Sequence, residues 1–387
     1  MAKYKIGDIC EIVSGSTPKT NIDEYWDGDI KWITPAELND DTYIITDSVR
    51  KITELAVKKT GLSSFPIGTV ILSSRAPIGK VAIAGCEMYC NQGFKNLICS
   101  DKINNKYLYW FLKKNTAFLN SLGRGATFKE ISKSIVSEIE INIPDIEKQR
   151  EVVETLEKVR GIIAFRKREL QLLDNLIKAR FVEMFGNIYN NRLGFDVVTL
   201  QDVSTMIKDG THQTPTYTTD VENGYKFLSS KDVTTGKVDW SHLKYIPEKL
   251  HRELYTRISP RKGDILLAKN GTTGIAAIVD RDEVFDIYVS LALIRPYGVD
   301  ATYLWAAINA AETKQQFDAS LKGIGVPNLH LNEIKKARII LPPIELQNQF
   351  AAFVRQVDKS KVVVSANIVY NIKRIKTEFL NYYFNEL

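Results

Sequence analysis

The chain has 387 residues, 44% of them hydrophobic and 25% charged, a composition typical of globular proteins and unlike that of disordered chains. Its formal net charge of +6 comes from 52 basic and 46 acidic residues spread along the chain, which permits nucleic-acid binding but forms no concentrated basic footprint. The N-terminus is charged and no stretch approaches about 18 apolar residues, so we predict no signal peptide, no membrane contact and a cytoplasmic location.

The distribution of cysteine and histidine argues against a metal site. The four cysteines lie in the first half of the chain and the four histidines in the second half. A zinc site needs such ligands together. We therefore predict no metal and no cofactor, and cysteines that stay reduced.

The first half reads as short strands and one clear hairpin. Residues 5–9 (KIGDI) and 31–33 (KWI) are each followed by a polar segment, a pattern that predicts a strand and then a turn. Residues 67–83 (IGTVILSSRAPIGKVAI) predict a β-hairpin, with Gly68 and Gly79 where the backbone must turn. An amphipathic helix follows near residue 107, and a strand ends at Pro144.

A long helix is predicted from residue 146 to residue 186. The segment contains no proline, and its alternating four-three positions from Gln149 onward are mostly apolar, as in a coiled-coil seam. At 1.5 Å per residue such a helix is about 60 Å long, longer than a compact domain of this size needs. The predicted seam residues here are Val152, Leu156, Val159, Leu170, Leu173 and Ile177.

The second half repeats the first. Residues 262–278 (KGDILLAKNGTTGIAAI) match the hairpin of residues 67–83 at a constant offset of 195, keeping the glycines and the apolar strands but changing the tip. Residues 199–203 and 226–228 match the two earlier strands, and the strand before Pro342 leads into a second helix. Its seam runs in the same phase as far as Glu378 and Tyr382. The predicted seam residues in it are Phe350, Val354, Val357, Val364, Ile368 and Ile375.

No catalytic motif is found. The region of Gly79 and Lys80 lacks the upstream glycine and the following Ser or Thr of a phosphate loop. Glu333 and Lys335 have a spacing found in nucleases, but no aspartate is suitably placed near them. The Pro-Pro pair at residues 342–343 lacks the Asn or Asp of an adenine methyltransferase motif, so we predict that the chain is not an enzyme.

The layout resembles a known family. Two variable globules, each followed by a long helix, a Gly-Ser-Thr-Pro loop at residues 15–18, and the junctions PDIEKQ (144–149) and PPIELQ (342–347) are similar to the specificity subunit of type I restriction-modification systems. The second loop, residues 209–215 (DGTHQTP), departs from the family pattern because it is longer.

The resemblance implies a fold and a function. We expect an α/β (α+β) fold with two homologous mixed α/β target-recognition domains, joined by two long antiparallel coiled-coil helices about a pseudo-twofold axis. The expected boundaries are 1–145 for the first domain, 146–187 for the central helix, 188–343 for the second domain and 344–387 for the C-terminal helix. Each domain would read half of a bipartite site on double-stranded DNA. The implied partners are modification (methyltransferase) subunits, two in number, and restriction (endonuclease/translocase) subunits.

We expect DNA contacts from the polar loops and hairpin tips, because their side chains offer the donors and acceptors that bases and phosphates need. Arg75, Lys269 and Asn270 are the best individual candidates. The alternatives are a phosphate contact or a surface ion pair for Arg75, and a turn role before Gly271 for Asn270. The full set is Thr17, Lys19, Thr20, Ser74, Arg75, Asn91, Gln92, Lys95, Arg124, His212, Thr214, Ser230, Lys231, Lys269, Asn270 and Thr272.

Two other functions fit parts of the pattern. A coiled-coil adaptor that joins two proteins through its globular heads needs no DNA specificity, and salt-dependent binding to duplex DNA separates it from a DNA reader. A nuclease would need metal-dependent cleavage by the chain alone.

Overall fold

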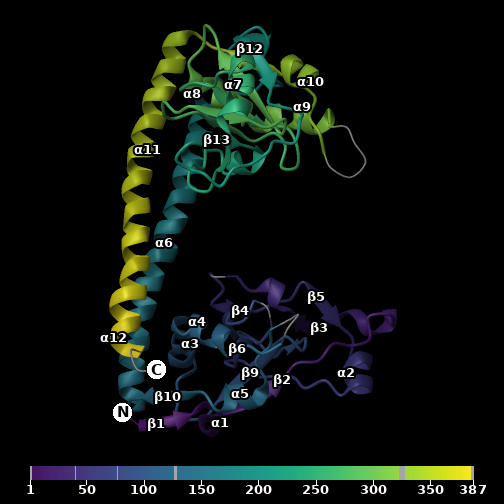
Figure 1. Cartoon of the computed structure of the whole chain (residues 1–387), viewed down its shortest axis with the longest axis vertical. Helices are drawn as coiled ribbons and strands as arrows, with labels where there is room; N and C mark the ends of the chain where they lie inside the picture. The colour runs from purple at the N-terminus through teal and green to yellow at the C-terminus, as the bar shows by residue number, and fades with distance from the viewer. Residues whose placement is uncertain (1, 40, 76, 126–128, 322–326, 385–387) are drawn as a thin grey trace. The chain divides into compact units, whose positions relative to one another are not determined.

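The structure is a computed structural model that describes residues 2–39, 41–75, 77–125, 129–321 and 327–384. The chain forms two compact units, the first made of residues 1–167 and 366–387 and the second of residues 168–365. Figure 1 shows the elements of each unit. The units are divided within the two long helices, and the domain boundaries predicted after residues 145, 187 and 343 stay predictions.

The elements of the first unit are short except for one helix. In chain order they are β1 (Ala2–Lys5), α1 (Ile6–Ile9), β2 (Cys10–Ser14), η1 (Asp23–Tyr25), β3 (Trp26–Ile33), η2 (Pro35–Glu37), β4 (Ile44–Ile45), β5 (Arg50–Ile52), α2 (Glu54–Thr60), β6 (Val70–Ser73), β7 (Val81–Ala84), β8 (Tyr89–Cys90), β9 (Phe94–Cys99), α3 (Asn105–Lys114), α4 (Thr116–Ser121), α5 (Lys133–Ser137), β10 (Glu140–Ile143) and the beginning of α6 (Ile146–Phe185).

The second unit follows a similar order. Its elements are β11 (Asp196–Thr199), β12 (Ser204–Asp209), β13 (Tyr225–Leu228), η3 (Ser230–Val233), β14 (Lys244–Ile246), α7 (Glu248–Arg257), β15 (Ile265–Ala268), β16 (Ala276–Ile278), β17 (Phe285–Ile287), β18 (Leu291–Pro296), α8 (Ala301–Ile308), α9 (Ala311–Ala319), α10 (Leu331–Lys336), β19 (Arg338–Leu341) and most of α11 (Ile344–Lys373). The last turns, η4 (Arg374–Phe379) and α12 (Leu380–Phe384), belong to the first unit.

The sheets of the two units have the same strand order, except that the first unit adds the edge strand β4 beside β7. The strand order β2-β9-β6-β7 of the first unit corresponds to β12-β18-β15-β16 of the second, and β5-β3-β8 corresponds to β14-β13-β17. Each three-stranded sheet contains one antiparallel and one parallel pair, and β1-β10 and β11-β19 are antiparallel ribbons. The predicted repeat, both hairpins and the mixed α/β class are therefore confirmed.

The strands predicted at residues 5–9 and 199–203 are both wrong, and residues 200–203 form turns between β11 and β12. Residues 6–9 form a helical turn, α1, and only Lys5 belongs to the strand before it. Ile6 and Ile9 are both buried. A strand would turn residues three apart to opposite faces, whereas one helical turn brings both to the same face, so the core favours the helix.

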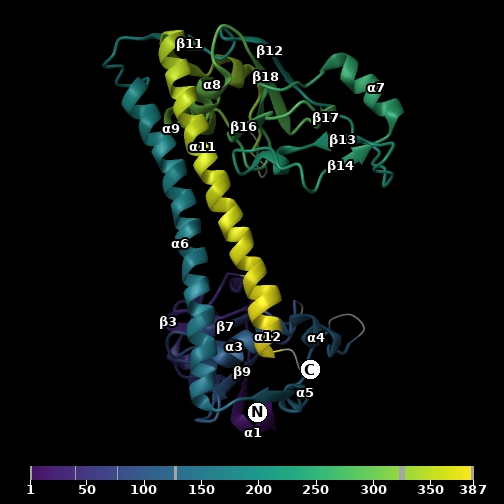
Figure 2. The ribbon, with the colours of Figure 1, turned by 90° about the vertical axis from the view of Figure 1, so that its left-hand side faces the viewer.

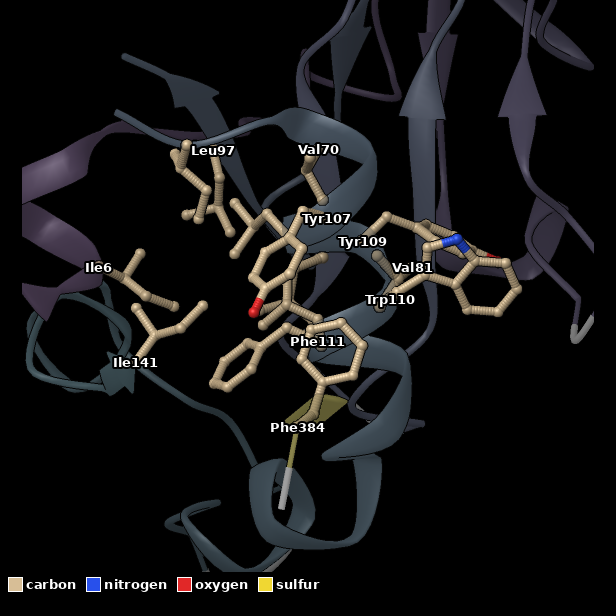
Figure 3. Close-up of a cluster of buried hydrophobic side chains, with 14 of the residues drawn as sticks. Ile6, Val70, Val81, Leu97, Tyr107, Tyr109, Trp110, Phe111, Ile141 and Phe384 are labelled. Atoms are coloured by element: carbon tan, nitrogen blue, oxygen red, sulfur yellow. The ribbon is translucent and has the colours of Figure 1, made fainter. Parts of the chain in front are cut away.

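The core of the first unit surrounds helix α3. Tyr107 and Phe111 project from α3 toward Phe384 of α12, with ring centroids 4.9 and 6.2 Å away (Figure 3). The start of α6 packs into the same core through Val152 and Leu156. The end of the chain thus completes the hydrophobic core of the first unit.

In the second unit the two long helices lie side by side (Figure 2) and run antiparallel. The ring of Phe185 lies 5.6 Å from that of Phe350, and one Asp174 carboxylate oxygen lies 2.6 Å from the Lys361 ammonium nitrogen. From the first contact to the second, the residue number falls from 185 to 174 on α6 and rises from 350 to 361 on α11, so the two helices are antiparallel.

The seam phase is wrong beyond Ile375. Tyr382, predicted to lie in the seam, is 81% exposed, whereas Leu380 and Phe384 are buried. Residues 374–379 form a turn of π-helix, whose hydrogen bonds span five residues instead of four. This turn explains the spacing of five between buried Ile375 and buried Leu380.

Each long helix is joined to its domain by a buried glutamine at its first turn. The Gln149 side chain accepts a hydrogen bond from Asn104 N and donates to the carbonyls of Lys102 and Pro144. The Gln347 side chain likewise accepts from Asp300 N and donates to Pro342 O. We call Gln149 and Gln347 the junction glutamines.

Candidate nucleic-acid interface

The hairpin tips of the two units have the same backbone frame. We call residues 74–80 the first tip and residues 269–275 the second tip. Ser74 N donates to Gly93 O at 2.7 Å, and Lys269 N donates to Ser290 O at 2.9 Å. Ser74 O accepts from Ile131 N, and Lys269 O accepts from Leu329 N. Ser74 and Lys269 are therefore equivalent positions in the repeat.

A glycine ends each tip because the backbone turns there with positive φ. Gly79 has φ of 92° and Gly274 has φ of 80°, values that side chains other than glycine rarely adopt. Gly79 N donates to Ser73 O and Gly274 N donates to Ala268 O, so both glycines close the hairpin in the same way. A Cβ on Gly79 would also lie 2.8 Å from Thr116.

The first tip carries a buried lysine and a shared carboxylate. Lys95 is 6% exposed, and its Nζ donates to Ser74 Oγ at 3.3 Å and to Glu130 Oε1 at 3.4 Å. The other oxygen of Glu130 accepts from Arg75 Nε at 2.8 Å. Burial alone would raise the pKa of Glu130, but the Arg75 hydrogen bond and the Lys95 charge outweigh it and lower the pKa.

The second tip has the same components from other positions. Lys269 is buried, and its Nζ donates to Asp209 Oδ2 at 2.9 Å. The same oxygen lies 3.1 Å from His212 Nε2, and Arg257 Nη2 donates to the Asp209 and Gly210 carbonyls. Burial alone would raise the pKa of Asp209, but the hydrogen bond and charge of Lys269, followed by His212, lower it.

Several predicted residues of the first unit lie together around its tip. The Thr17 hydroxyl donates to the Gln92 side-chain oxygen, and Asn91 Oδ1 accepts from Gly93 N, which adjoins the tip. Arg124 exchanges backbone hydrogen bonds with Glu130. A pocket of about 370 Å³ is lined by Thr34, Pro35, Ala36, Arg75, Pro77, Lys80, Asn91 and Gly93. Lys19 and Thr20 are exposed on the loop after β2.

The second unit gathers fewer of its predicted residues. A pocket of about 440 Å³ is lined by Asp209, His212, Lys269, Asn270, Val289, Asn328, His330, Leu331 and Asn332. Ser230 N donates to Ser290 Oγ, which connects the segment after β13 to the tip. Thr214, Lys231 and Thr272 are exposed. The sequence predicts that residues 323–325 (GIG) correspond to residues 123–125 (GRG), and residues 323–325 lie outside the described residues.

The predicted seam residues lie on inner faces of the long helices. All are buried except Leu170 and Leu173, which are half-buried. Val152, Leu156, Val159 and Ile375 belong to the first core, and Ile177, Phe350, Val354 and Val357 belong to the second core.

Sequence reasoning missed two acidic residues, Glu130 and Asp209, and one basic residue, Arg257, of the candidate interface. Glu130 binds Arg75, Asp209 binds Lys269, and Arg257 binds Asp209. A backbone bridge joins Asn328 to Asn270 as another joins Glu130 to Arg75. The only available signal was that Asp209 opens the polar loop already singled out. Glu130 had none. Among the described residues, no group of His, Cys, Asp and Glu is arranged to hold a metal ion, and no helix has the length and apolar character that crossing a bilayer requires.

Comparison with known proteins gives a consistent result. The family model for the type I restriction modification DNA specificity domain matches residues 1–175 and 193–377. The chain is 32% identical to the type I restriction enzyme MjaIX specificity subunit of Methanocaldococcus jannaschii, over 97% of this chain and 90% of that protein. It is 24% identical to the MjaVIII specificity subunit of the same organism, with the same two coverages of 97% and 90%.

Solved structures show the same fold. The S subunit of a type I restriction-modification system from M. genitalium matches with a TM-score of 0.50 and 14% identity, over 100% of this chain and 96% of that chain. A chain from a structure that describes assembly and conformational transition of the type I R-M system matches with a TM-score of 0.58 and 17% identity, over 100% of this chain and 98% of that chain.

Proposed function

Since the chain belongs to the family of type I restriction modification DNA specificity domains, we propose that it selects the DNA target of such a system and that each domain reads one half of a bipartite, asymmetric site. As a specificity subunit it recognises DNA. A coiled-coil adaptor without DNA specificity is not favoured, because the family model covers both halves of the chain and describes DNA specificity domains.

The observation that carries the proposal is one backbone frame with two different sets of tip side chains. Arg75 of the first tip corresponds to Asn270 of the second. Arg75 forms a backbone bridge with Glu130, and Asn270 forms one with the equivalent residue, Asn328. An Arg side chain matches two acceptors of guanine, and an Asn side chain matches the donor and acceptor of adenine in the major groove. Different side chains at equivalent positions support two different half-sites.

The predicted contact residues divide into tips and flanking loops. We propose that residues on the tips contact base edges and that exposed Lys19, Lys231 and Arg124 contact phosphates, which hold the protein in register without reading sequence. Phosphate contacts by these side chains make binding weaken as salt rises.

The chemistry is assigned to partners. We propose that the chain is not itself an enzyme and that it acts in the cytoplasm with two modification subunits, together with restriction subunits where the system has them. The matching strand order of the two domains supports one modification subunit for each domain.

Methylome sequencing of a host with and without this chain tests the proposal. We expect a methylated motif of two unlike half-sites separated by a fixed spacer, present only when the chain is expressed with its modification subunits. A methylome that does not change when the chain is removed contradicts the proposal. Equal affinity of the assembled complex for duplexes with and without the motif contradicts it as well.

A further inference from the structure

Each unit buries a lysine ammonium beside its hairpin tip, but the lysine comes from β9 in the first unit and from the tip itself in the second. In the first unit Lys95 on β9 is paired with Leu72 on β6. The equivalent pair in the second unit is Ala292 on β18 with Leu267 on β15, so an alanine stands where the first unit has its lysine. Lys269 stands where the first unit has Ser74. Both units thus have the positive charge, but the lysine that carries it lies on β9 in the first unit and on the tip in the second.

Each buried ammonium is bound by a carboxylate that also holds an exposed side chain. Glu130 binds Lys95 through one oxygen and the Arg75 guanidinium through the other. Asp209 binds both Lys269 and His212 through the same oxygen. The Arg75 side chain is 44% exposed and the His212 side chain is 67% exposed, in contrast to 7% and 6% for the two lysines.

Burial decides which of these side chains is available to DNA. Lys269 cannot reach a base edge without leaving Asp209, and that separation would leave a buried charge without a partner. His212 is exposed and lines the pocket that also contains Asn270, Asn328 and His330. Because its Nε2 is bound to Asp209, its Nδ1 is the ring nitrogen available to a base.

The buried lysine also gives its carboxylate a fixed position. An ion pair between two exposed side chains holds its geometry weakly, because both chains are flexible and water competes with the contact. A carboxylate that binds a buried ammonium already has a restricted side-chain conformation in the free protein. The exposed partner is therefore bound to a rigid acceptor, which reduces the cost of ordering it on binding.

We propose that Glu130 and Asp209 are positioning residues, each of which is held by a buried lysine and orients one exposed donor toward DNA: Arg75 in the first domain and His212 in the second. The inference rests on the proposed function and deepens it. It assigns the direct contact of the second domain to His212 instead of Lys269, which serves from inside the fold.

The test uses the full chain assembled with its modification subunits. Duplexes carry either the motif identified by methylome sequencing or single base changes in one half of it, and Kd is measured for each at one salt concentration. The variants are His212→Ala, Asp209→Ala, and Asp209→Ala combined with Lys269→Met. The thermal midpoint of each variant is measured beside its affinity.

We expect His212→Ala to reduce discrimination about tenfold at particular base pairs of one half-site only, the loss of about one good base contact. Asp209→Ala destabilises the fold by leaving Lys269 unpaired. Adding Lys269→Met is expected to restore the thermal midpoint but not the discrimination, because His212 still lacks its acceptor. The double variant should therefore match His212→Ala, at the same base pairs.

The first domain supplies a matched experiment and the second a control. Glu130→Ala with Lys95→Met, and Arg75→Ala, are expected to relax the other half-site. Glu248→Gln removes a carboxylate from an exposed ion pair with Arg252 on α7 and should leave discrimination unchanged.

Two results overturn the inference. If the double variant recovers discrimination together with stability, Asp209 serves only to neutralise Lys269. If His212→Ala discriminates as well as the parent chain while the double variant does not, Lys269 itself is the contact. Failure of the proposed function gives a different result, because the parent complex would then bind all duplexes alike.

Discussion

The first and second tips differ in where their charges come from, although the backbone around them is the same. In the first tip the lysine lies on β9 and the carboxylate comes from the segment before α5. In the second tip the lysine lies on the tip itself, and the carboxylate ends β12. Both units therefore have a buried ion pair at the same point of the fold, although the lysine and the carboxylate come from different sequence positions. A sequence alignment of the two halves pairs Ser74 with Lys269, so it does not reveal that Lys95 and Lys269 have equivalent roles.

The two carboxylates also differ in burial. The side chain of Glu130 is 33% exposed and that of Asp209 only 10% exposed. Asp209 also accepts from more partners, since Arg257 joins Lys269 and His212. The second tip therefore depends more strongly on its acid than the first does.

The largest expected effect follows from that difference. Asp209→Ala should lower the free energy of unfolding by about 3–5 kcal/mol, because it leaves the buried Lys269 charge without its partner. Glu130→Ala should cost only about 1–3 kcal/mol, since Lys95 keeps the Ser74 hydroxyl and Glu130 was partly solvated. Urea unfolding of both variants measures the difference. Equal losses would remove the asymmetry between the tips.

The junction glutamines should show no such asymmetry. Gln149→Ala and Gln347→Ala each leave buried backbone groups without hydrogen-bond partners, and each is expected to cost about 1–3 kcal/mol. Thermal unfolding checks this. A large loss for one variant and none for the other would show that the two domains hold their helices differently.

Recognition should separate the tips again, with an effect of about 1–3 kcal/mol for each good base contact. Arg75→Ala should relax one half-site only, and Asn270→Ala should affect only the other. Binding to duplexes altered in one half distinguishes them. A uniform loss of affinity with a smaller salt slope would identify a phosphate contact instead. An effect on both half-sites would count against one domain reading one half.

The smallest expected effect is the pH dependence of these ion pairs. Glu130 and Asp209 both have lowered pKa values in the folded protein. Burial raises each pKa, but the hydrogen bonds and charges of the neighbouring cations lower it by more. Unfolded Asp and Glu titrate near about 3.9 and 4.3, so their stabilisation is present above those values and is lost as pH falls through the lower folded pKa. The stability gap between the parent and Asp209→Asn should therefore be constant near neutral pH and shrink below about pH 4. Urea midpoints between neutral and acidic pH measure it, and a gap that persists at the acidic end would show that the charge of Asp209 contributes little.

Much of the fold could be predicted because it is written in local patterns. Paired glycines flank apolar strands in both hairpins, a proline ends the strand before each long helix, and the repeat confirms each reading with a second copy. The short turn at Ile6 and Ile9 was missed because four residues carry too little periodicity to separate a strand from a helical turn. The end of the C-terminal helix was misread because a π-helical turn shifts the seam by one residue.

The charges at the interface could not be predicted from local patterns. Glu130 lies 55 residues from Arg75 and Asp209 lies 60 residues from Lys269, so their pairing exists only after the sheets form. A lysine in an isolated sequence is expected to be exposed, and Lys269 was accordingly taken as a surface contact. Its burial depends on a carboxylate supplied by another strand.

The junction glutamines have a consequence for how such a protein can change over time. Gln149 binds the start of α3, where Asn105 Nδ2 donates to Gly68 O, two residues before β6 begins. The first tip follows the other end of that strand. The attachment of the helix and the proposed recognition surface therefore lie at opposite ends of β6. We expect mutations at the tip to leave the attachment intact, so that a lineage can acquire a new DNA target by drift or recombination in the tips while its assembly with partner subunits is inherited unchanged.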